Sequence, residues 1–206
     1  MTRRHNAHKR LLRSFFSRPL GLELIVATVL FAVAYAWEML RPVQLGAQLT
    51  WSIGWLPSGV LVALLPLLII PVLETPAARS WVGLRSLRHN VDSLLVPLFG
   101  NLSWFEMVLM AVLAGLSEEV FFRGVLQREI GLVAASIAFG LLHTVSVSYV
   151  IWAAAVGLYL GFWVHLMQNL WPAIVAHIVI DFVGLCYLRL IVAPRSGRTI
   201  TTDDVE

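Results

Sequence analysis

The sequence predicts an all-α protein, a polytopic bundle of about six transmembrane helices. Composition is the first observation that predicts this fold class: 59% of the 206 residues are hydrophobic and only 13% are charged. In a soluble domain about a quarter of the residues carry charge. Hydropathy patterning is the second observation, because several apolar stretches approach or exceed the roughly 20 residues that a helix needs to cross the bilayer core. The chain length suits one compact domain.

The first two expected spans lie in the N-terminal third of the chain. They are Gly21–Leu40 and Trp51–Leu73, and Pro57, Pro66 and Pro71 favour kinks in the second. Basic residues precede the first span, as in a signal peptide. Its apolar run is too long for the usual hydrophobic region of such a peptide, so we expect a retained membrane anchor.

The most polar interior stretch, Glu74–Asp92, separates these spans from the rest. We expect it to be a loop on the same side of the membrane as the N-terminus. Four more spans are expected after it: Leu94–Val125, Gly131–His143, Tyr149–Met167 and Trp171–Val192. We expect Leu94–Val125 to break near Gly100, and Gly131–His143 is short for a full crossing.

This order divides the chain into four parts: a basic segment 1–20, helices with a polar loop 21–93, a helical core 94–193 and a polar tail 194–206. Arg residues lie near both ends, and six crossings put both termini on one side, so we expect cytoplasmic termini in a cell membrane. The basic segment lacks the interleaved aromatic residues of a nucleic-acid surface. The expected partner is therefore the lipid bilayer and not nucleic acid. The lone Cys186 has no partner for an internal disulfide.

Charged side chains inside the apolar stretches are the informative residues, because an Asp or Arg at the centre of a membrane helix costs about 2.5–3.5 kcal/mol. The first group contains Glu118, Glu119 and Arg123. Residues i and i+4 share a helix face, so Glu119 is expected to pair with Arg123. Glu118 then faces Phe121 and Phe122. We assign Glu118 as a general base and the pair as structural; alternatively both acids satisfy Arg123, or Glu118 faces water.

Two histidines mark the other polar groups. His143 ends an apolar helix, a position where a hydrogen-bonded core histidine is the commoner role. His177 and Asp181 lie at i and i+4 in the last apolar stretch, where a carboxylate can orient an imidazole. The alternative is a pair that braces the bundle by itself. Because polar groups on three apolar helices all need polar partners, we expect them to share one cavity.

The three motifs resemble those of the CAAX protease and bacteriocin-processing family of membrane endopeptidases, which includes the CAAX prenyl endopeptidase. The matching motifs are Glu118-Glu119-x-x-x-Arg123, Phe139-x-x-x-His143 and His177-x-x-x-Asp181. The resemblance covers about residues 114–185 and includes the order of the motifs.

The resemblance implies a role for each residue. Glu118 and His143 would activate the attacking water, His177 and Asp181 would bind the oxyanion or complete the polar site, and Glu119 and Arg123 would support them. The last position is often Asn in the family. Because an ionised carboxylate only accepts hydrogen bonds, Asp181 is expected to orient His177 or to bind a metal.

The function implied by the resemblance is an intramembrane endopeptidase, a hydrolase that processes a membrane-associated peptide or protein of CAAX type or of leader or bacteriocin type. The family is commonly labelled as metalloprotease, and two His with carboxylates form an acceptable zinc-ligand set, here Glu118, His143, His177 and Asp181. The ligands would come from three helices and HExxH is absent, so we expect no obligatory metal, with zinc as the alternative. Two other function classes stay open: a catalytically silent membrane scaffold and, less favoured, a small transporter.

Overall fold

The computed structural model describes residues 19–195, and every secondary structure element in that range is helical. The principal α-helices are α2 (Pro19–Leu40), α4 (Trp55–Leu67), α5 (Ile69–Leu73), α7 (Val82–Asn90), α9 (Trp104–Glu119), α11 (Leu132–Leu142), α12 (Val147–Met167) and α13 (Trp171–Tyr187). Short α-helices complete the chain: α3 (Leu45–Gln48), α6 (Ala77–Ser80), α8 (Val96–Phe99), α10 (Gln127–Ile130) and α14 (Ala193–Arg195). Three segments are π-helical, η1 (Val91–Leu95), η2 (Val120–Leu126) and η3 (Leu188–Val192).

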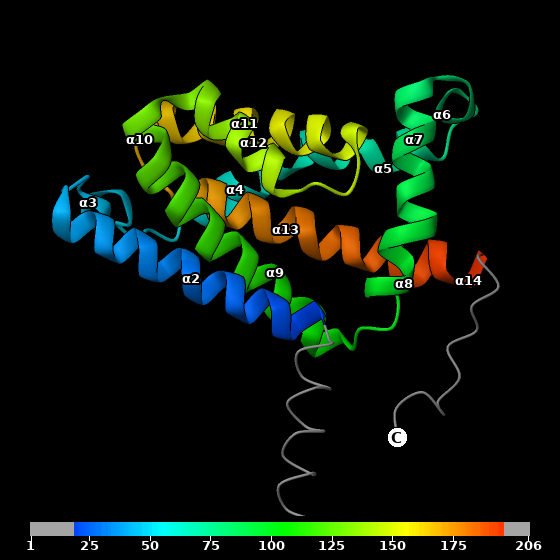
Figure 1. Cartoon of the computed structure of the whole chain (residues 1–206), viewed down its shortest axis with the longest axis horizontal. Coiled ribbons are helices and arrows are strands. Elements are labelled where there is room, and N and C mark those ends of the chain that lie inside the picture. Colours follow the sequence, from blue (N-terminus) through cyan, green and yellow to red (C-terminus); the bar gives the residue numbers. More distant parts are fainter. Residues whose placement is uncertain (1–18, 196–206) are drawn as a thin grey trace, which may run out of the picture.

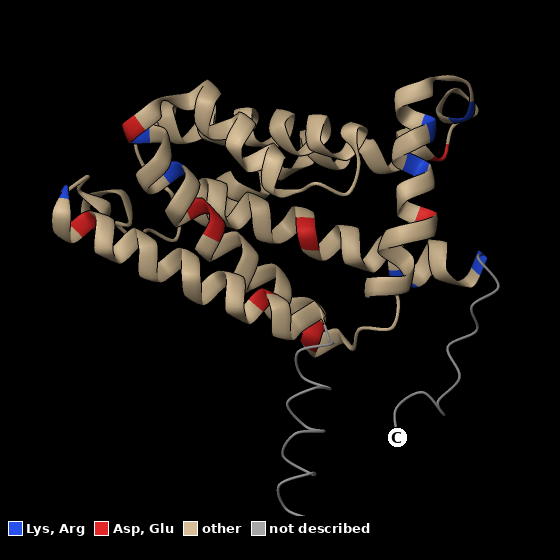
Figure 2. Cartoon of the chain, in the orientation of Figure 1, with Lys and Arg blue, Asp and Glu red and all other residues tan. Residues whose placement is uncertain are grey.

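The prediction of an all-α polytopic membrane protein is confirmed. Four helical segments in the described part of the chain are long and apolar enough to span a membrane: Pro19–Leu40, Trp55–Leu73, Val147–Met167 and Trp171–Arg195. A fifth crossing results if the bent pair Val82–Phe99 and Trp104–Ile130 forms one span. The expected span Gly131–His143 appears as the 11-residue helix α11, which is shorter than a full crossing. Figure 2 shows how little of the helical surface belongs to charged residues.

The expected break near Gly100 is present as a bend of 112° between residues 99 and 104. Ser103 starts the new helix as a capping box: its hydroxyl accepts the backbone N–H of Glu106, and the Glu106 carboxylate accepts that of Ser103. These two hydrogen bonds satisfy backbone donors that a helix start leaves free. The chain can therefore change direction here without an unpaired helix end.

The stretch Glu74–Asp92 is not a loop as predicted, because most of it forms α6 and α7. The helix α7 is amphipathic. Leu84, Leu87 and Val91 lie on one face and pack into a cluster with Leu73, Leu188 and Val192, at the i, i+3, i+7 spacing of a helix that buries one side. The polar residues of α7 lower its mean hydropathy, so a hydropathy average does not reveal the apolar face.

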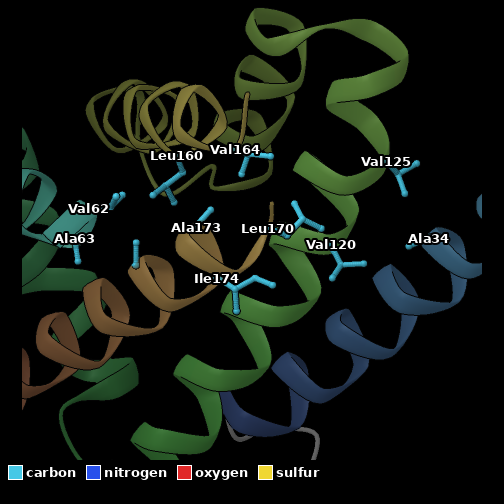
Figure 3. Packing of buried hydrophobic residues seen from close by; sticks show 11 residues of the cluster. Ala34, Val62, Ala63, Val120, Val125, Leu160, Val164, Leu170, Ala173 and Ile174 are labelled. Atoms are coloured by element: carbon cyan, nitrogen blue, oxygen red, sulfur yellow. The ribbon is translucent and has the colours of Figure 1, made fainter. Parts of the chain in front are cut away.

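The largest apolar cluster joins α2, α4, η2, α12 and α13, and Figure 3 shows its side chains gathered between those helices. In Figure 1, α9 crosses α13 near the centre of the bundle, and α2 runs beside α9. The crossing is close because it uses a glycine: a methyl group at Gly115 would lie 2.6 Å from Cγ1 of Ile178. Gly115 precedes Glu118 by three residues and Ile178 follows His177, so this contact brings two of the predicted motifs together.

The proposed division into four parts stays a prediction. Most of the basic segment 1–20 and of the tail 194–206 lies outside the described residues. The expected position of both termini on the cytoplasmic side also stays a prediction.

Candidate active site

Glu118 and Glu119 are the last two residues of α9, directly before the π-helical η2. Both are buried, with exposed fractions of 9% and 0%. Oε1 of Glu119 lies 2.9 Å from Nη1 of Arg123, which is buried as well. The predicted ion pair between these residues is therefore present. Wide π-helical turns recur at functional sites, because they change the direction of the side chains that follow.

Glu119 has a second partner that the sequence spacing did not predict. Its Oε1 lies 2.7 Å from Nδ1 of His177 on α13. A carboxylate paired with Arg accepts hydrogen bonds, so this contact assigns the proton to Nδ1 and fixes the ring. Asp181 lies on the other side of the imidazole, with Oδ2 3.5 Å from Nε2. The contact that orients the His177 ring is thus made by Glu119, and Asp181 faces the nitrogen that points towards Glu118.

His143 follows the last residue of α11 and caps that helix. Its backbone N–H donates to the carbonyl of Gly140, and its ring Nδ1 donates to the carbonyl of Phe139 at 2.8 Å. A carbonyl accepts only, so in the neutral ring the lone pair is on Nε2. This nitrogen lies 3.8 Å from Oε2 of Glu118.

Glu118 stands between the two imidazoles. Its Oε2 lies 3.8 Å from Nε2 of His143 and 3.9 Å from Nε2 of His177, and it has no hydrogen-bond partner within the described residues. Both separations exceed the length of a direct hydrogen bond. They suit a water molecule or a substrate atom that contacts the carboxylate and either ring. Figure 2 shows acidic positions at the end of α9 and on α13 towards the middle of the bundle.

One cavity of about 360 Å³ contains all four predicted catalytic residues. Glu118, His143, His177 and Asp181 line it, as do Tyr149 and Glu23, and the remaining lining residues are apolar or glycine apart from Tyr187 and Trp152. The prediction that the three polar groups share a cavity agrees with this geometry. Glu119 and Arg123 lie behind the wall and do not line it.

The apolar wall next to Glu118 differs from the prediction. Phe121 and Phe122 do not line the cavity, whereas Phe139 of α11 and Ala111 and Ala114 of α9 do. The prediction assumed regular α-helical spacing, and the π-helix that starts at Val120 changes the directions of the side chains after Glu119. Phe122 packs instead against Phe139, with ring centroids 5.1 Å apart.

The same residues do not form a metal site. Between residues 19 and 195 no group of three or more His, Cys, Asp or Glu side chains is arranged to hold a metal ion. The alternative zinc set of Glu118, His143, His177 and Asp181 therefore does not fit this geometry.

This fold and site define a helical membrane protein in which two histidines and a buried carboxylate from three helices meet at one cavity. Residues 100–183 match the family model described as type II CAAX prenyl endopeptidase Rce1-like. The resemblance predicted from the motifs is thereby confirmed over this segment, which contains all six predicted site residues.

A curated relative is similar over a longer stretch. It is described as "Uncharacterized protein YpbD" of Bacillus subtilis (strain 168) and is 31% identical over 124 residues, 59% of this chain and 65% of that protein. The matched region spans just under two thirds of the relative's length. No solved structure matches the chain.

Proposed function

We propose that the protein is an intramembrane endopeptidase that hydrolyses a peptide bond with a water molecule activated by Glu118 and His143. One observation carries this proposal: Oε2 of Glu118 lies within 3.9 Å of both His143 and His177, which come from two other helices, inside one cavity. The family match to a CAAX prenyl endopeptidase over residues 100–183 supports the same reaction class.

Water activation follows from the hydrogen bonds of His143. Because Nδ1 donates to the Phe139 carbonyl, Nε2 of the neutral ring accepts, and it faces the same space as Oε2 of Glu118. A water between these two acceptors has one proton directed at each of them. As the water oxygen attacks the scissile carbonyl, the proton directed at Glu118 passes to that carboxylate. The resulting carboxylic acid then protonates the leaving amine. General acid–base catalysis of this kind contributes about 100- to 10,000-fold to a rate.

His177 is the group that stabilises the oxyanion in this proposal. Glu119 accepts from Nδ1, and the carboxylates of Glu118 and Asp181 both lie within 4 Å of Nε2, so the imidazolium form is favoured. Nε2–H then donates to the oxygen that becomes negative in the tetrahedral intermediate. A donor held in place before the reaction is worth more than a mobile one, because it does not reorganise at the transition state.

The membrane setting and the family match support a proposal for the substrate class. The apolar lining of the cavity and the spanning helices favour a membrane-associated peptide or protein. We propose CAAX-type processing, or processing of a leader- or bacteriocin-type peptide, in a cell membrane with both termini cytoplasmic.

A cleavage assay on the purified protein tests this proposal. The wild type is incubated in detergent with a quenched membrane-peptide library, next to Glu118→Gln and His143→Ala. We expect wild-type cleavage and a loss of about 100-fold or more in kcat/KM for each variant. Glu129→Gln is the matched control, since Glu129 pairs with Arg41 and Trp37 away from the cavity. Equal activity of all four folded proteins would overturn the assignment, and a wild type that binds peptides without cleaving them would favour the scaffold.

A further inference from the structure

Glu23 is a carboxylate that the proposed reaction does not use. It lies near the start of α2, an apolar helix whose only other charged residue is Glu38. Glu38 has partners, because its carboxylate accepts the backbone N–H groups of Val43 and Leu45. Oε1 of Glu23 is buried and has no hydrogen-bond partner within the described residues. An unpaired polar atom in such a place is costly, which points to a partner that arrives from outside the chain.

The position of Glu23 joins it to the active site. It lines the same cavity as Glu118, His143, His177 and Asp181, and its helix packs along α9, the helix that carries Glu118. Residue 23 lies outside the segment 100–183 that matches the family model. The acid/base centre is thus extended by a residue that the family motifs do not contain.

The charges around the cavity favour a cationic ligand. Three carboxylates line it, those of Glu23, Glu118 and Asp181, and the part of the lining formed by residues 19–195 contains no Lys or Arg. The nearby Arg123 lies behind the wall in its pair with Glu119. Glu118 is only 9% exposed, and its Oε2 has no hydrogen-bond partner among residues 19–195. In the proposed mechanism His143 is neutral and His177 carries one positive charge, which does not balance three carboxylates. A positive group that enters the cavity therefore gains both attraction and hydrogen bonds.

We propose that Glu23 is a specificity-determining residue that binds the side chain of a Lys or Arg close to the scissile bond of the peptide substrate. This inference rests on the proposed endopeptidase function. The apolar walls suit such a side chain, because its aliphatic stem packs on hydrophobic surface while its charged end reaches the carboxylate. Ionised Glu23 only accepts hydrogen bonds, and ammonium and guanidinium groups only donate them.

The test compares two peptides that differ only in one side-chain ammonium group. A peptide cleaved by the wild type is made with Lys or with the uncharged norleucine at each position within three residues of the cleaved bond. We expect one position at which the wild type prefers Lys by about 10- to 100-fold in kcat/KM, the range for a charge-assisted hydrogen bond. In Glu23→Gln this ratio falls to about one, and in Glu23→Asp a part of it remains. Glu38→Gln removes a carboxylate from the same helix outside the cavity and keeps the wild-type ratio.

A binding measurement separates this inference from the proposed function. Affinities of the Lys and norleucine forms of a membrane peptide that the protein binds, cleaved or not, are measured for Glu118→Gln and for Glu118→Gln/Glu23→Gln. Preferential Lys binding that requires Glu23 supports the inference even if the wild type cleaves no peptide, in which case only the proposed function fails. Cleavage of both peptides at equal rates by the wild type overturns the inference alone. It is overturned as well if Glu23→Gln slows cleavage of both peptides by the same factor.

Discussion

Removing the Glu119 carboxylate is expected to lower both the stability and the activity of this protein. Removing the Arg123 charge as well is expected to restore the stability alone. In Glu119→Leu, Arg123 keeps a buried charge without its anion, and His177 loses the acceptor at Nδ1. The Glu119 and Arg123 side chains are 0% and 2% exposed, and their charged atoms are 2.9 Å apart. At an effective dielectric constant of about 20 the attraction is about 6 kcal/mol.

Part of this attraction only offsets the cost of burying the Glu119 carboxylate, a cost that the variant no longer carries. The cation–π contact of Arg123 with the Phe139 ring, at 4.3 Å from the guanidinium carbon to the ring centre, exists with or without Glu119 and cancels from the comparison. The expected loss in free energy of unfolding is about 3–5 kcal/mol, the range for removing one partner of a buried pair. Equilibrium unfolding in mixed detergent micelles measures it.

The double variant Glu119→Leu/Arg123→Met is the decisive control. It removes both charges, so its stability is expected to return to within about 1 kcal/mol of the wild type. Its peptidase activity is expected to stay low, because His177 still lacks the carboxylate that orients its ring. Two results would refute this reasoning: a single variant as stable as the wild type, or a double variant that regains activity together with stability.

Three further predictions concern packing, acid sensitivity and metal. Gly115→Ala places a methyl group 2.6 Å from Ile178. It is expected to cost about 1–3 kcal/mol of unfolding free energy and to lower activity. Gly83→Ala, which meets no atom within 4 Å and lies outside the cavity lining, is expected to change neither by a comparable amount. The hydrogen bond from Tyr187 lowers the pKa of Glu74 below its ordinary value of 4.5. The stability that Glu74 contributes is therefore complete above pH 4.5 and lost as the pH falls through the lowered pKa, and Glu74→Gln removes this acid dependence of the unfolding midpoint. A strong chelator is expected to leave cleavage unchanged, and activity that is lost and then restored by added zinc would contradict this.

Hydropathy predicted the helices well where a span consists of one uninterrupted apolar helix. The expected Gly21–Leu40 corresponds to α2, Pro19–Leu40, and the expected Tyr149–Met167 to α12, Val147–Met167. It failed for Glu74–Asp92, because α7 is polar on average and hides its apolar face from a window average. The π-helix η2 was not predictable either. Its wide turns replace regular hydrogen bonds at a place where α9 meets other helices, which is a property of packing and not of local sequence.

Spacing within a helix predicted contacts within a helix. The pair Glu119–Arg123 and the neighbours His177 and Asp181 follow from the i, i+4 rule and are present. The contact between Glu119 and His177 joins residues 58 positions apart. It depends on how closely α9 approaches α13, and the closeness is set by the missing side chain of Gly115. A sequence shows that glycine, but without a partner helix it does not indicate which surface approaches it.

Glu23 shows why position along a helix is a poor measure of position in a membrane protein. By sequence it lies near the end of a span, where a carboxylate usually reaches water, and no motif includes it. In the fold α2 runs beside α9. The start of α2 therefore lines a cavity whose other walls come from neighbouring helices. The free-energy cost of burying a carboxylate then depends on whether the neighbouring helices leave a polar cavity next to it. For Glu23 they leave the cavity that Glu118 and His177 also line, and a residue that hydropathy assigns to the membrane surface becomes part of the wall of the candidate active site.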